Sequence, residues 1–374
     1  MQIDHPSALL GGLSPAQFMR RHWQRRPLVV RGAWPGVKAP LPRAELLALA
    51  ADDGVESRLV RRDGSRWSLQ RGPFARRALP SLKHPLWTLL VQGMDLHVDG
   101  ARAMLEPFRF VTDARLDDLM ISFATDGGGV GPHVDPYDVF LIQLEGRRRW
   151  RLGPAKDRRL VADAPLKLLQ HFEPTQDIVL EPGDLLYLPP MWGHDGIAVG
   201  TCMTASVGFR APTRQTIVRE VLPLLADALP EAASWDGLYR DAGESATATP
   251  GRVPQSLERF ARAAWQRVLG EPGRLAQALG QWLTEPKAQV WFDAGSVPAD
   301  ASRPLRLDRR SRMMYDLRHV YLNGEAFTIA ARDLRVMRKL ADRRELSIAE
   351  RGRLGSAARA LIDQWAEAGW LHEL

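Results

Sequence analysis

Residues 127–150 read GGGVGPHVDPYDVFLIQLEGRRRW, and the pattern of this stretch decides the fold. Glycine and proline come first, an apolar run follows, and a second run rich in arginine comes directly after it. Short β-runs and turns bearing glycine or proline continue in this way over residues 119–210. The runs are LMISFAT, YDVFLIQLE, RRRWRLG, DIVLEPG, DLLYLPP, GIAVG and TASVGF. Many short strands with regular turns predict a barrel or a double-sheet β-fold.

Two histidines and one aspartate in this region have the types and positions of metal ligands. His133 and Asp135 are two residues apart at the end of an apolar strand, so both side chains would point to the same face. His194 ends a second strand that opens with Glu-Pro-Gly-Asp, and a folded sheet can bring it to the first two. Two imidazoles and a carboxylate can hold one face of an iron(II) ion and leave the other open, as in non-haem iron oxygenases. We therefore predict that these three residues bind a catalytic metal ion.

The strand that follows the HxD motif is expected to supply a cation for an acidic co-substrate. Alternation along this strand divides its side chains between two faces, one of which must be interior. The two sets are Arg147, Arg149 and Arg151 against Arg148 and Trp150. A buried arginine needs an anionic partner, and a carboxylate held by two hydrogen bonds is its best match. The competing interpretation is a solvated basic edge strand.

Hydroxyl groups and glycines add to the predicted site. Ser122, on the strand LMISFAT, and Tyr137 are candidates to hydrogen-bond the same carboxylate. The run Gly127–Gly129 precedes a strand rather than a helix, and no Lys-Ser or Lys-Thr pair follows it, which argues against a phosphate-binding loop. We interpret these glycines as a flexible lip that lets a substrate backbone approach the metal.

Composition and charge limit the class of protein. No stretch approaches the roughly 20 apolar residues of a membrane span, and the N-terminus lacks the features of a signal peptide. The single cysteine, Cys202, excludes an intrachain disulfide, and these features favour a cytoplasmic location. No G-x-S-x-G or C-x-x-C motif is present. The net charge of +7 indicates either an acidic partner or a compositional bias towards arginine.

The sequence on either side of the β-rich region has a different period. A helix beginning at Ser14 and a strand over Pro27–Arg31 are expected near the N-terminus. Beyond Pro212 the apolar spacing becomes helical, and Tyr321–Phe327 predicts a hairpin with Asn-Gly at its turn. Two further amphipathic helices follow, and the last segment is interpreted as a winged-helix domain. The apolar helix faces comprise Ile217, Val218, Val221, Leu222 and Leu225; Leu257, Phe260, Ala261, Ala264, Trp265 and Val268; Leu275, Leu279, Trp282 and Leu283; Leu334, Met337 and Leu340; and Leu354, Ala358, Leu361, Ile362 and Trp365.

Three strings resemble the bacterial JmjC-type ribosomal oxygenases, in the branch that hydroxylates an arginine of large-subunit ribosomal protein L-16. They are HVDPYDVFLIQLEGRRRWRLGP, EPGDLLYLPPMWGHDG and SVGFRAPT. The HxD…H part is shared by all JmjC enzymes, whereas GGVGPHxDxYDVF and GRRRW are much narrower. The resemblance covers nearly the whole chain and includes FMRRHWQRRPLVVRGAWP near the N-terminus.

The resemblance implies a mainly β fold with added helices. The architecture would be a double-stranded β-helix, the JmjC or cupin-like barrel, preceded by helices within residues 1–212. A helical dimerisation segment would occupy residues 213–296, and a winged-helix domain residues 297–374. A homodimer is expected, and the surplus of apolar helical surface agrees with it.

The resemblance also implies the chemistry. Iron(II) would be held by His133, Asp135 and His194. The co-substrate 2-oxoglutarate would be held through its distal carboxylate by Arg148, helped by Ser122. The enzyme would be a dioxygenase that hydroxylates the β-carbon of one arginine of ribosomal protein L-16. We expect no direct contact with nucleic acid and none with a membrane.

Two questions stay open at this point. Because enzyme and substrate would both be basic, an acidic patch near the active-site mouth is required. The function also has alternatives, and one is a JmjC enzyme that hydroxylates a histidine or lysine in another basic protein. Another is a non-catalytic DNA-binding sensor that uses the winged helix, and a cupin isomerase or storage protein is disfavoured because such sites usually hold three or more histidines. The candidates for the acidic patch are Asp113, Asp117, Asp118 and Asp126.

Overall fold

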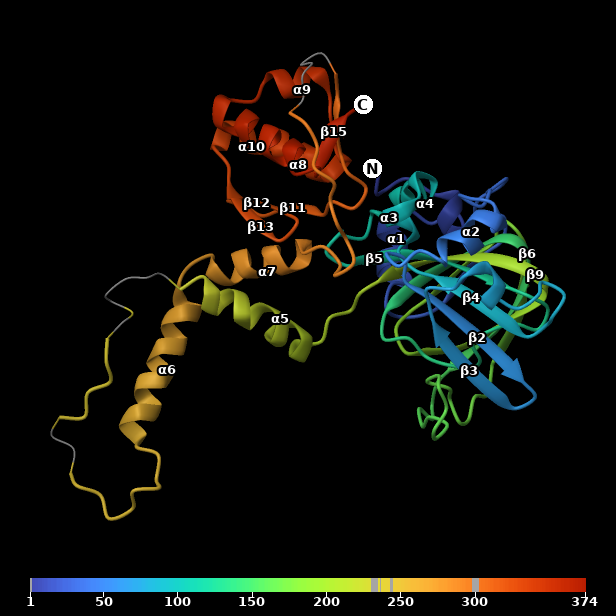
Figure 1. Ribbon diagram of the computed structural model, residues 1–374, viewed down its shortest axis with the longest axis horizontal. Helices are drawn as coiled ribbons and strands as arrows, with labels where there is room; N and C mark the ends of the chain where they lie inside the picture. Colours follow the sequence, from blue (N-terminus) through green and yellow to red (C-terminus); the bar gives the residue numbers. More distant parts are fainter. Residues whose placement is uncertain (1, 230–234, 236, 243–244, 298–302) are drawn as a thin grey trace. The chain divides into compact units, whose positions relative to one another are not determined.

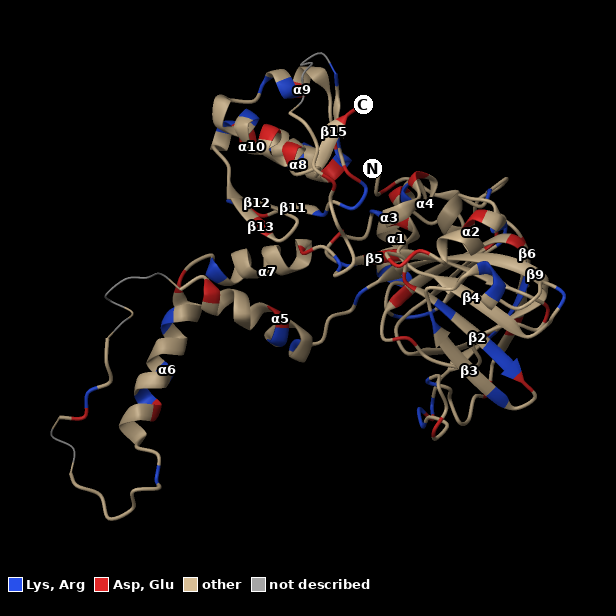
Figure 2. Ribbon diagram, viewed as in Figure 1, with Lys and Arg blue, Asp and Glu red and all other residues tan. Residues whose placement is uncertain are grey.

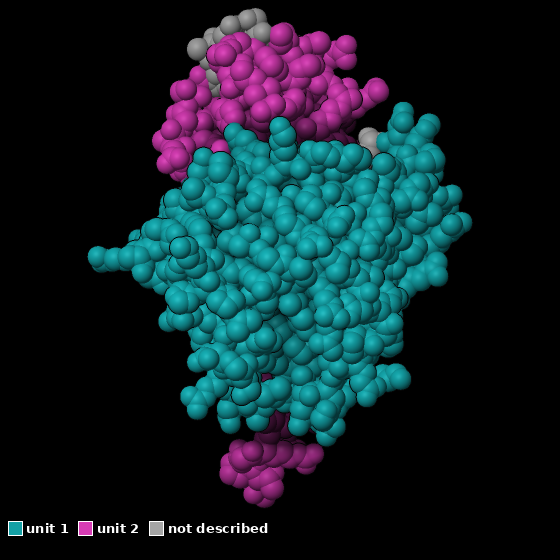
Figure 3. Space-filling view, turned by 90° about the vertical axis from the view of Figure 1, so that its right-hand side faces the viewer, with its two compact units in different colours: residues 1–211, 288–291 teal, residues 212–287, 292–374 magenta. Residues whose placement is uncertain are grey.

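The computed structural model describes residues 2–229, 235, 237–242, 245–297 and 303–374. The chain forms two compact units, which Figure 3 shows in different colours. Unit 1 consists of residues 1–211 and 288–291, and unit 2 of residues 212–287 and 292–374. Residues 298–302, near the predicted start of the third segment, lie outside the described residues. Within the described part of the chain, no helix is both long and apolar enough to cross a membrane.

Unit 1 is built on an antiparallel β-sheet with short helices on one face (Figure 1). Its elements are η1 (Ala8–Leu10), α1 (Pro15–Arg21), β1 (Leu28–Val30), α2 (Arg43–Leu49), β2 (Ser57–Asp63), β3 (Arg66–Arg71), η2 (Arg76–Ala78), β4 (Trp87–Val91), α3 (Met94–His97), α4 (Asp99–Leu105), η3 (Glu106–Phe108), β5 (Leu116–Ala124), β6 (Asp138–Pro154), β7 (Gln176–Leu180), β8 (Leu185–Leu188) and β9 (Trp192–Phe209). The strand order is β1-β8-β6-β9-β5-β4-β2-β3, with β7 also paired to β6. The predicted β-rich architecture of residues 119–210 is therefore confirmed.

The N-terminal helix begins where the sequence predicts. The backbone N–H of Gln17 donates to the Ser14 hydroxyl at 3.2 Å, and the Gln17 side chain accepts from the Ser14 N–H at 3.0 Å. This reciprocal pair is a capping box, which satisfies N–H groups that the first turn leaves without helical partners. The strand that follows, β1, pairs with β8 and so attaches the N-terminal segment to the main sheet.

Two long strands replace four predicted short ones. YDVFLIQLE and RRRWRLG join into β6, and GIAVG and TASVGF join into β9. Between the two predicted runs, Gly146 forms a bend inside β6, where φ is +62° and a Cβ would collide with the backbone oxygen of Thr201. Because of this bend, the first half of β6 pairs with β8 and the second half with β7. A local glycine therefore redirects the strand rather than ending it.

The register sorts the strands into two faces. Phe123, Phe140 and Val207 point into the large apolar core that also holds residues of α1, α2 and α4. The opposite face carries Ser122 on β5, paired in register with Thr204 on β9. Polar side chains on this second face form the site described below.

Unit 2 contains helices followed by an α+β segment. Its elements are α5 (Arg214–Asp227), α6 (Gln255–Gly270), α7 (Arg274–Thr284), β10 (Leu305–Leu307), β11 (Met313–Tyr315), β12 (His319–Leu322), β13 (Glu325–Thr328), α8 (Ala331–Arg343), β14 (Glu345–Leu346), α9 (Ile348–Gly352), α10 (Ser356–Glu367) and β15 (Leu371–Glu373). The predicted hairpin is β12–β13, and both residues of its Asn323-Gly324 turn have positive φ, as a type I′ turn requires. The two predicted terminal helices are α8 and α10, with Met337 and Trp365 fully buried.

The helices α5–α7 bury only part of their apolar faces. Val221 and Leu225 of α5 are buried, but Val218 is 59% exposed. On α6, Trp265 is 48% exposed and Leu269 is 57% exposed. The sequence pattern therefore locates the helices correctly, while much of their apolar surface faces outward within the described chain.

Candidate metal centre

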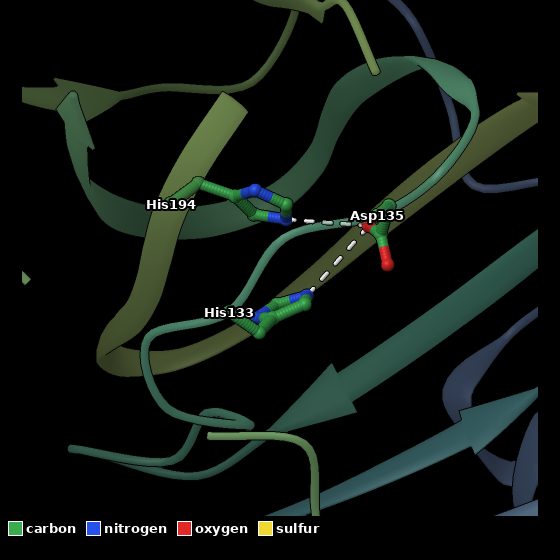
Figure 4. Close-up of side chains that lie close together, drawn as sticks. All are labelled: His133, Asp135 and His194. Carbon is green, nitrogen blue, oxygen red and sulfur yellow. Dashed lines mark ion pairs between the residues drawn. The ribbon is translucent and has the colours of Figure 1, made fainter. Parts of the chain in front are cut away.

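Three side chains suited to metal binding converge in unit 1 (Figure 4). Nε2 of His133 lies 3.7 Å from Oδ2 of Asp135, and Nε2 of His194 lies 3.4 Å from the same oxygen. The two imidazole centroids are 4.1 Å apart, and one ligand atom of each of the three residues lies within 4.8 Å of the others. Two nitrogen donors and one oxygen donor at this spacing fit a single transition-metal ion with open positions.

Backbone carbonyls orient both imidazoles. Nδ1 of His133 lies 2.8 Å from the oxygen of Gly131, and Nδ1 of His194 lies 2.9 Å from the oxygen of Trp192. A proton on each Nδ1 is donated to its carbonyl, so each Nε2 keeps its lone pair directed towards Asp135. The hydrogen bonds therefore select the tautomer that a metal ligand needs.

Burial and neighbouring charge set the ionisation of the ligands. Burial, followed by the effect of His194, lowers the pKa of His133 to about 4, which keeps this imidazole neutral. Burial by itself would raise the pKa of Asp135, but the two histidines outweigh it and lower the pKa to about 2. Neutral imidazole and ionised carboxylate are the forms that bind a metal ion.

The ligands do not sit at strand ends as the sequence suggested. His133 and Asp135 both lie in the loop before β6, and His194 lies near the start of β9. An isolated antiparallel bridge joins His133 to His194, with backbone N–H···O distances of 2.9 and 3.0 Å. The loop thus returns alongside β9, and this bridge, rather than alternation along one strand, brings the ligands together.

Arg148 is the interior member of the arginine strand. It is 4% exposed and Trp150 is 5% exposed, whereas Arg147 and Arg149 are exposed. The division of this strand into two faces is therefore confirmed, and the solvated-edge interpretation fails for Arg148. Trp150 lies close to both parts of the site, because its ring centroid is 5.3 Å from Cζ of Arg148 and 6.0 Å from the ring of His194.

A chain of buried polar side chains holds the Arg148 guanidinium. Nη1 donates to the Ser122 hydroxyl at 2.9 Å and to the Thr204 hydroxyl at 3.4 Å. The Gln143 amide donates to the Glu145 carbonyl at 2.8 Å, so its oxygen faces Thr204 and accepts the Thr204 proton at 3.0 Å. Each hydroxyl therefore presents lone pairs, and not its proton, to the arginine.

No carboxylate forms an ion pair with Arg148 anywhere in the described residues. Its Nε has no hydrogen-bond partner, and Nη2 reaches the Gly196 oxygen only at 3.4 Å. Burial lowers the pKa of Arg148, since the charged form is the one that loses hydration. A buried guanidinium of this kind is suited to an anionic ligand.

Comparisons with known proteins identify the family. Residues 103–217 match the JmjC domain and residues 263–372 match the ROXA-like winged helix. The chain is 37% identical over 275 residues to the ribosomal protein uL16 3-hydroxylase of Escherichia coli strain K12, covering 73% of this chain and 72% of that protein. The chain belongs to the JmjC ribosomal oxygenase family. The resemblance found in the sequence is thereby confirmed.

Solved members of the family have the same fold. A crystal structure of Escherichia coli YcfD matches with a TM-score of 0.84 and 30% identity, covering 97% of this chain and 98% of that one. The structure of the same ribosomal oxygenase in complex with cobalt and 2-oxoglutarate matches with a TM-score of 0.79 and 30% identity, covering 96% and 98%. This JmjC oxygenase therefore has the cupin-like barrel and C-terminal winged helix that the sequence predicts.

Tyr137 takes a different place from the predicted one. Burial of its hydroxyl and the negative charge of Asp135 raise the pKa of Tyr137, and the hydroxyl interacts with that carboxylate rather than with Arg148. The residue as a whole is 37% exposed. Its ring is thus part of the accessible surface beside the ligand Asp135.

The four aspartates proposed as an acidic patch all have partners. Asp113 pairs with Arg109 at 2.6 Å, and Asp117 pairs with Arg210 at 2.8 Å. Asp126 accepts the Gly200 N–H at 2.8 Å, and the buried Asp118 accepts the Gly93 N–H at 3.0 Å. They do not form one free patch. The charge of Asp118 nevertheless contributes to the raised pKa of Tyr137, whose hydroxyl interacts with Asp135.

The glycine run packs closely against neighbouring backbone. A Cβ on Gly128 would collide with the Trp87 oxygen, and a Cβ on Gly129 would collide with the Gly196 oxygen. The backbone of Gly128 also accepts the Ala198 N–H at 2.8 Å. These glycines let the loop that leads to His133 lie against β4 and β9.

Thr204 and Gln143 were not predicted from the sequence. Both are fully or almost fully buried polar residues on strands that the sequence does predict. A polar side chain inside an apolar strand is the signal that could have found them, because such a group needs an interior partner. Its partner, Arg148, lies on another strand, and spacing along the chain does not reveal that contact.

Proposed function

We propose that the chain is an iron(II)- and 2-oxoglutarate-dependent dioxygenase that hydroxylates the β-carbon of an arginine in ribosomal protein uL16, the L-16 protein of the large subunit. The observation that carries the proposal is the buried, unpaired Arg148 guanidinium, joined through Trp150 to a His-Asp-His donor set. The relative that is 37% identical acts on uL16 by name, which supports the same substrate here.

The metal ligands in this proposal are His133, Asp135 and His194. Arg148 and Ser122 bind the distal carboxylate of 2-oxoglutarate, and the relay from Gln143 through Thr204 keeps the guanidinium oriented. Iron(II), 2-oxoglutarate and dioxygen together supply the oxidant that inserts one oxygen atom into a C–H bond, with succinate and carbon dioxide as co-products. The protein positions the target carbon and excludes water from the reaction.

Asp118 and Tyr137 are the residues that suit a substrate arginine. A guanidinium pairs with a carboxylate through its fork of N–H donors and stacks on an aromatic face. Asp118 is buried and close enough to influence the half-exposed Tyr137, which itself contacts Asp135. A side chain bound by this pair would end beside the metal ligands. A lysine or histidine target, the alternative from the sequence, would use the same carboxylate but lose the bidentate fit.

We also propose that the chain acts in the cytoplasm as a homodimer formed through α5–α7. The exposed apolar residues on these helices support self-association, because Val221, Leu225, Val268 and Ala278 alone form the buried cluster of α5–α7 within the described residues. They are Val218, Leu222, Leu257, Phe260, Trp265, Leu269 and Leu275.

Oxygen consumption and succinate formation test the proposed chemistry. Wild-type protein supplied with iron(II) and 2-oxoglutarate should form succinate in proportion to added uL16. An Asp135→Ala variant should fold and lose turnover, while Asp117→Ala, which removes a surface carboxylate of the same size, should keep it. Near-full turnover by Asp135→Ala would refute the ligand assignment, and succinate formation independent of uL16 would refute the substrate.

A further inference from the structure

The β2–β3 hairpin carries a concentration of cations that the proposed chemistry does not use. Arg61, Arg62, Arg66 and Arg71 are exposed, and Asp63 is the single carboxylate among residues 57–71. None of the four arginines has an ion-pair partner among the residues that the structure describes. Figure 2 shows the Lys and Arg colour along both strands. We call these four residues the hairpin arginines.

The hairpin is an open end of the sheet. β3 is the last strand in the order, so its outer edge has no strand partner within the described part of unit 1. Beyond Arg61, which is paired with Trp87 of β4, the hairpin continues past the start of β4. Arg62 and Arg66 therefore lie beyond the part of the hairpin that is paired to β4, where a large partner can reach them, whereas Arg71 is paired with Arg58 at the other end of the hairpin.

The hairpin also borders the site. In the register of β2, β4 and β5, Arg58 aligns with Leu90 and Leu90 with Ser122, the hydroxyl that contacts Arg148. A Cβ on Gly131 would lie 3.1 Å from the Trp67 ring, and Gly131 accepts the hydrogen bond from His133. Trp67 of β3 therefore lies next to the loop that carries the metal ligands.

These charges oppose a free basic substrate and match a polyanion. Two of the four aspartates considered for an acidic patch, Asp113 and Asp117, are already neutralised by ion pairs with arginines, so they do not offset the charge of the hairpin. Arginine forks match phosphate oxygens, and arginine and tryptophan planes stack on unpaired bases. The Arg62 guanidinium carbon lies 5.6 Å from the Trp67 ring centroid, which is a cation–π contact.

We propose that the β2–β3 hairpin binds RNA, and that the enzyme meets its ribosomal protein substrate in an RNA-bound form. The choice of RNA over an acidic protein rests on the proposed function, because a ribosomal protein is bound to RNA in its working state. This proposal departs from the expectation of no direct nucleic-acid contact. The hairpin arginines are a surface separate from the winged helix, in unit 1.

Fluorescence anisotropy with a labelled RNA stem-loop tests the surface in the full-length chain. The triple variant Arg61→Glu, Arg66→Glu and Arg71→Glu should weaken binding by roughly tenfold or more and flatten its dependence on salt. Changing the same three arginines to glutamine should also weaken RNA binding, but by a smaller factor. Thermal unfolding checks that both variants fold.

The matched control applies the same charge change to unit 2. Arg318, Arg335 and Arg353 are exposed and have no ion pair among the described residues. Changing all three to glutamate should leave RNA affinity within about twofold of wild type. If the hairpin glutamate variant and the unit 2 glutamate variant lost RNA affinity equally, net charge alone would drive binding. If only the unit 2 variant lost affinity, the winged helix would be the RNA-binding surface. Either result overturns the proposal, as does wild-type binding by the hairpin variant.

Hydroxylation assays separate this proposal from the function on which it rests. The hairpin glutamate variant should match wild type on a short uL16 peptide and show a lower kcat/KM on uL16 bound to RNA. Equal kcat/KM on both substrates would refute a role in substrate encounter. If wild type hydroxylates neither substrate but still binds RNA through the hairpin, the proposed reaction fails and the RNA surface stands.

Discussion

Replacing Arg148 with methionine should separate stability from co-substrate binding, because the two effects are predicted to have opposite signs. The guanidinium is 4% exposed and has no carboxylate partner among the described residues. Its hydrogen bonds are one contact of 2.9 Å to Ser122 and two of 3.4 Å to Thr204 and Gly196. Only the first has good geometry, so these contacts offset little of the cost of burying the charge.

The magnitudes follow from that imbalance. Exchanging a buried charged group for an apolar one of similar volume is neutral or stabilising by about 1–4 kcal/mol. Ser122 can still donate to the Thr204 carbonyl, and Thr204 to Gln143, so neither hydroxyl proton is left without an acceptor. We therefore expect the metal-free methionine variant to be as stable as wild type or more stable. Loss of a hydrogen-bonded charge pair with the 2-oxoglutarate carboxylate should cost about 2–5 kcal/mol of binding.

Two measurements test this prediction. Urea unfolding without ligand gives the stability, and 2-oxoglutarate titration of the metal-loaded protein gives an affinity expected to fall roughly 30-fold to several-thousand-fold. Arg148→Lys is the matched control, since it keeps the charge but loses the fork, and its affinity should be intermediate. A methionine variant destabilised by more than about 2 kcal/mol, with 2-oxoglutarate affinity unchanged, would show that Arg148 is a structural residue.

Three further changes probe the surroundings of the site and unit 2. Gly196→Ala should lower 2-oxoglutarate affinity, since its Cβ would lie 2.6 Å from the Trp150 ring and 3.0 Å from Arg148 Nε; an unchanged KM would refute the close packing. Tyr187→Phe should lower the unfolding free energy by about 1–3 kcal/mol, because the hydroxyl donates to the buried Asp138 at 2.6 Å; a fully stable variant in urea would contradict this. Lys339 and the other partners of Glu350 lower the pKa of this carboxyl to about 2. The ionised carboxylate therefore stabilises the fold fully above the ordinary pKa of 4.5, and this contribution is lost as the pH falls towards 2. Glu350→Gln should therefore lower Tm at pH 7 more than at pH 3, and an equal loss at both would exclude an ionic contribution.

The sequence predicts the identity of the site residues better than the way they come together. The choice of His133, Asp135 and His194 needs only residue types and neighbouring turns, and the structure places their ligand atoms within 4.8 Å. The predicted cause, alternation on one strand, is wrong because the loop before β6 forms a bridge to β9. A bridge between segments so far apart in sequence depends on the sheet order, and local spacing does not encode that order.

The burial of individual side chains on a strand was predictable from the two-residue alternation of side chains between its faces. Alternation separated Arg148 from Arg147 and Arg149, and their exposure agrees. The separation of YDVFLIQLE from RRRWRLG was wrong because Gly146 forms a bend within one continuous strand, β6. The partners of the candidate acidic residues were not predictable either, since Arg210, the partner of Asp117, lies on a distant segment.

Tandem mass spectrometry of uL16 after reaction tests the central claim most directly. The enzyme is loaded anaerobically with iron(II) and 2-oxoglutarate, mixed with recombinant uL16, and exposed to oxygen. The account predicts a gain of one oxygen atom on the β-carbon of a single arginine, absent without 2-oxoglutarate and absent with Asp135→Ala. Unmodified uL16 from a wild-type enzyme that still binds iron(II) and 2-oxoglutarate would contradict the account.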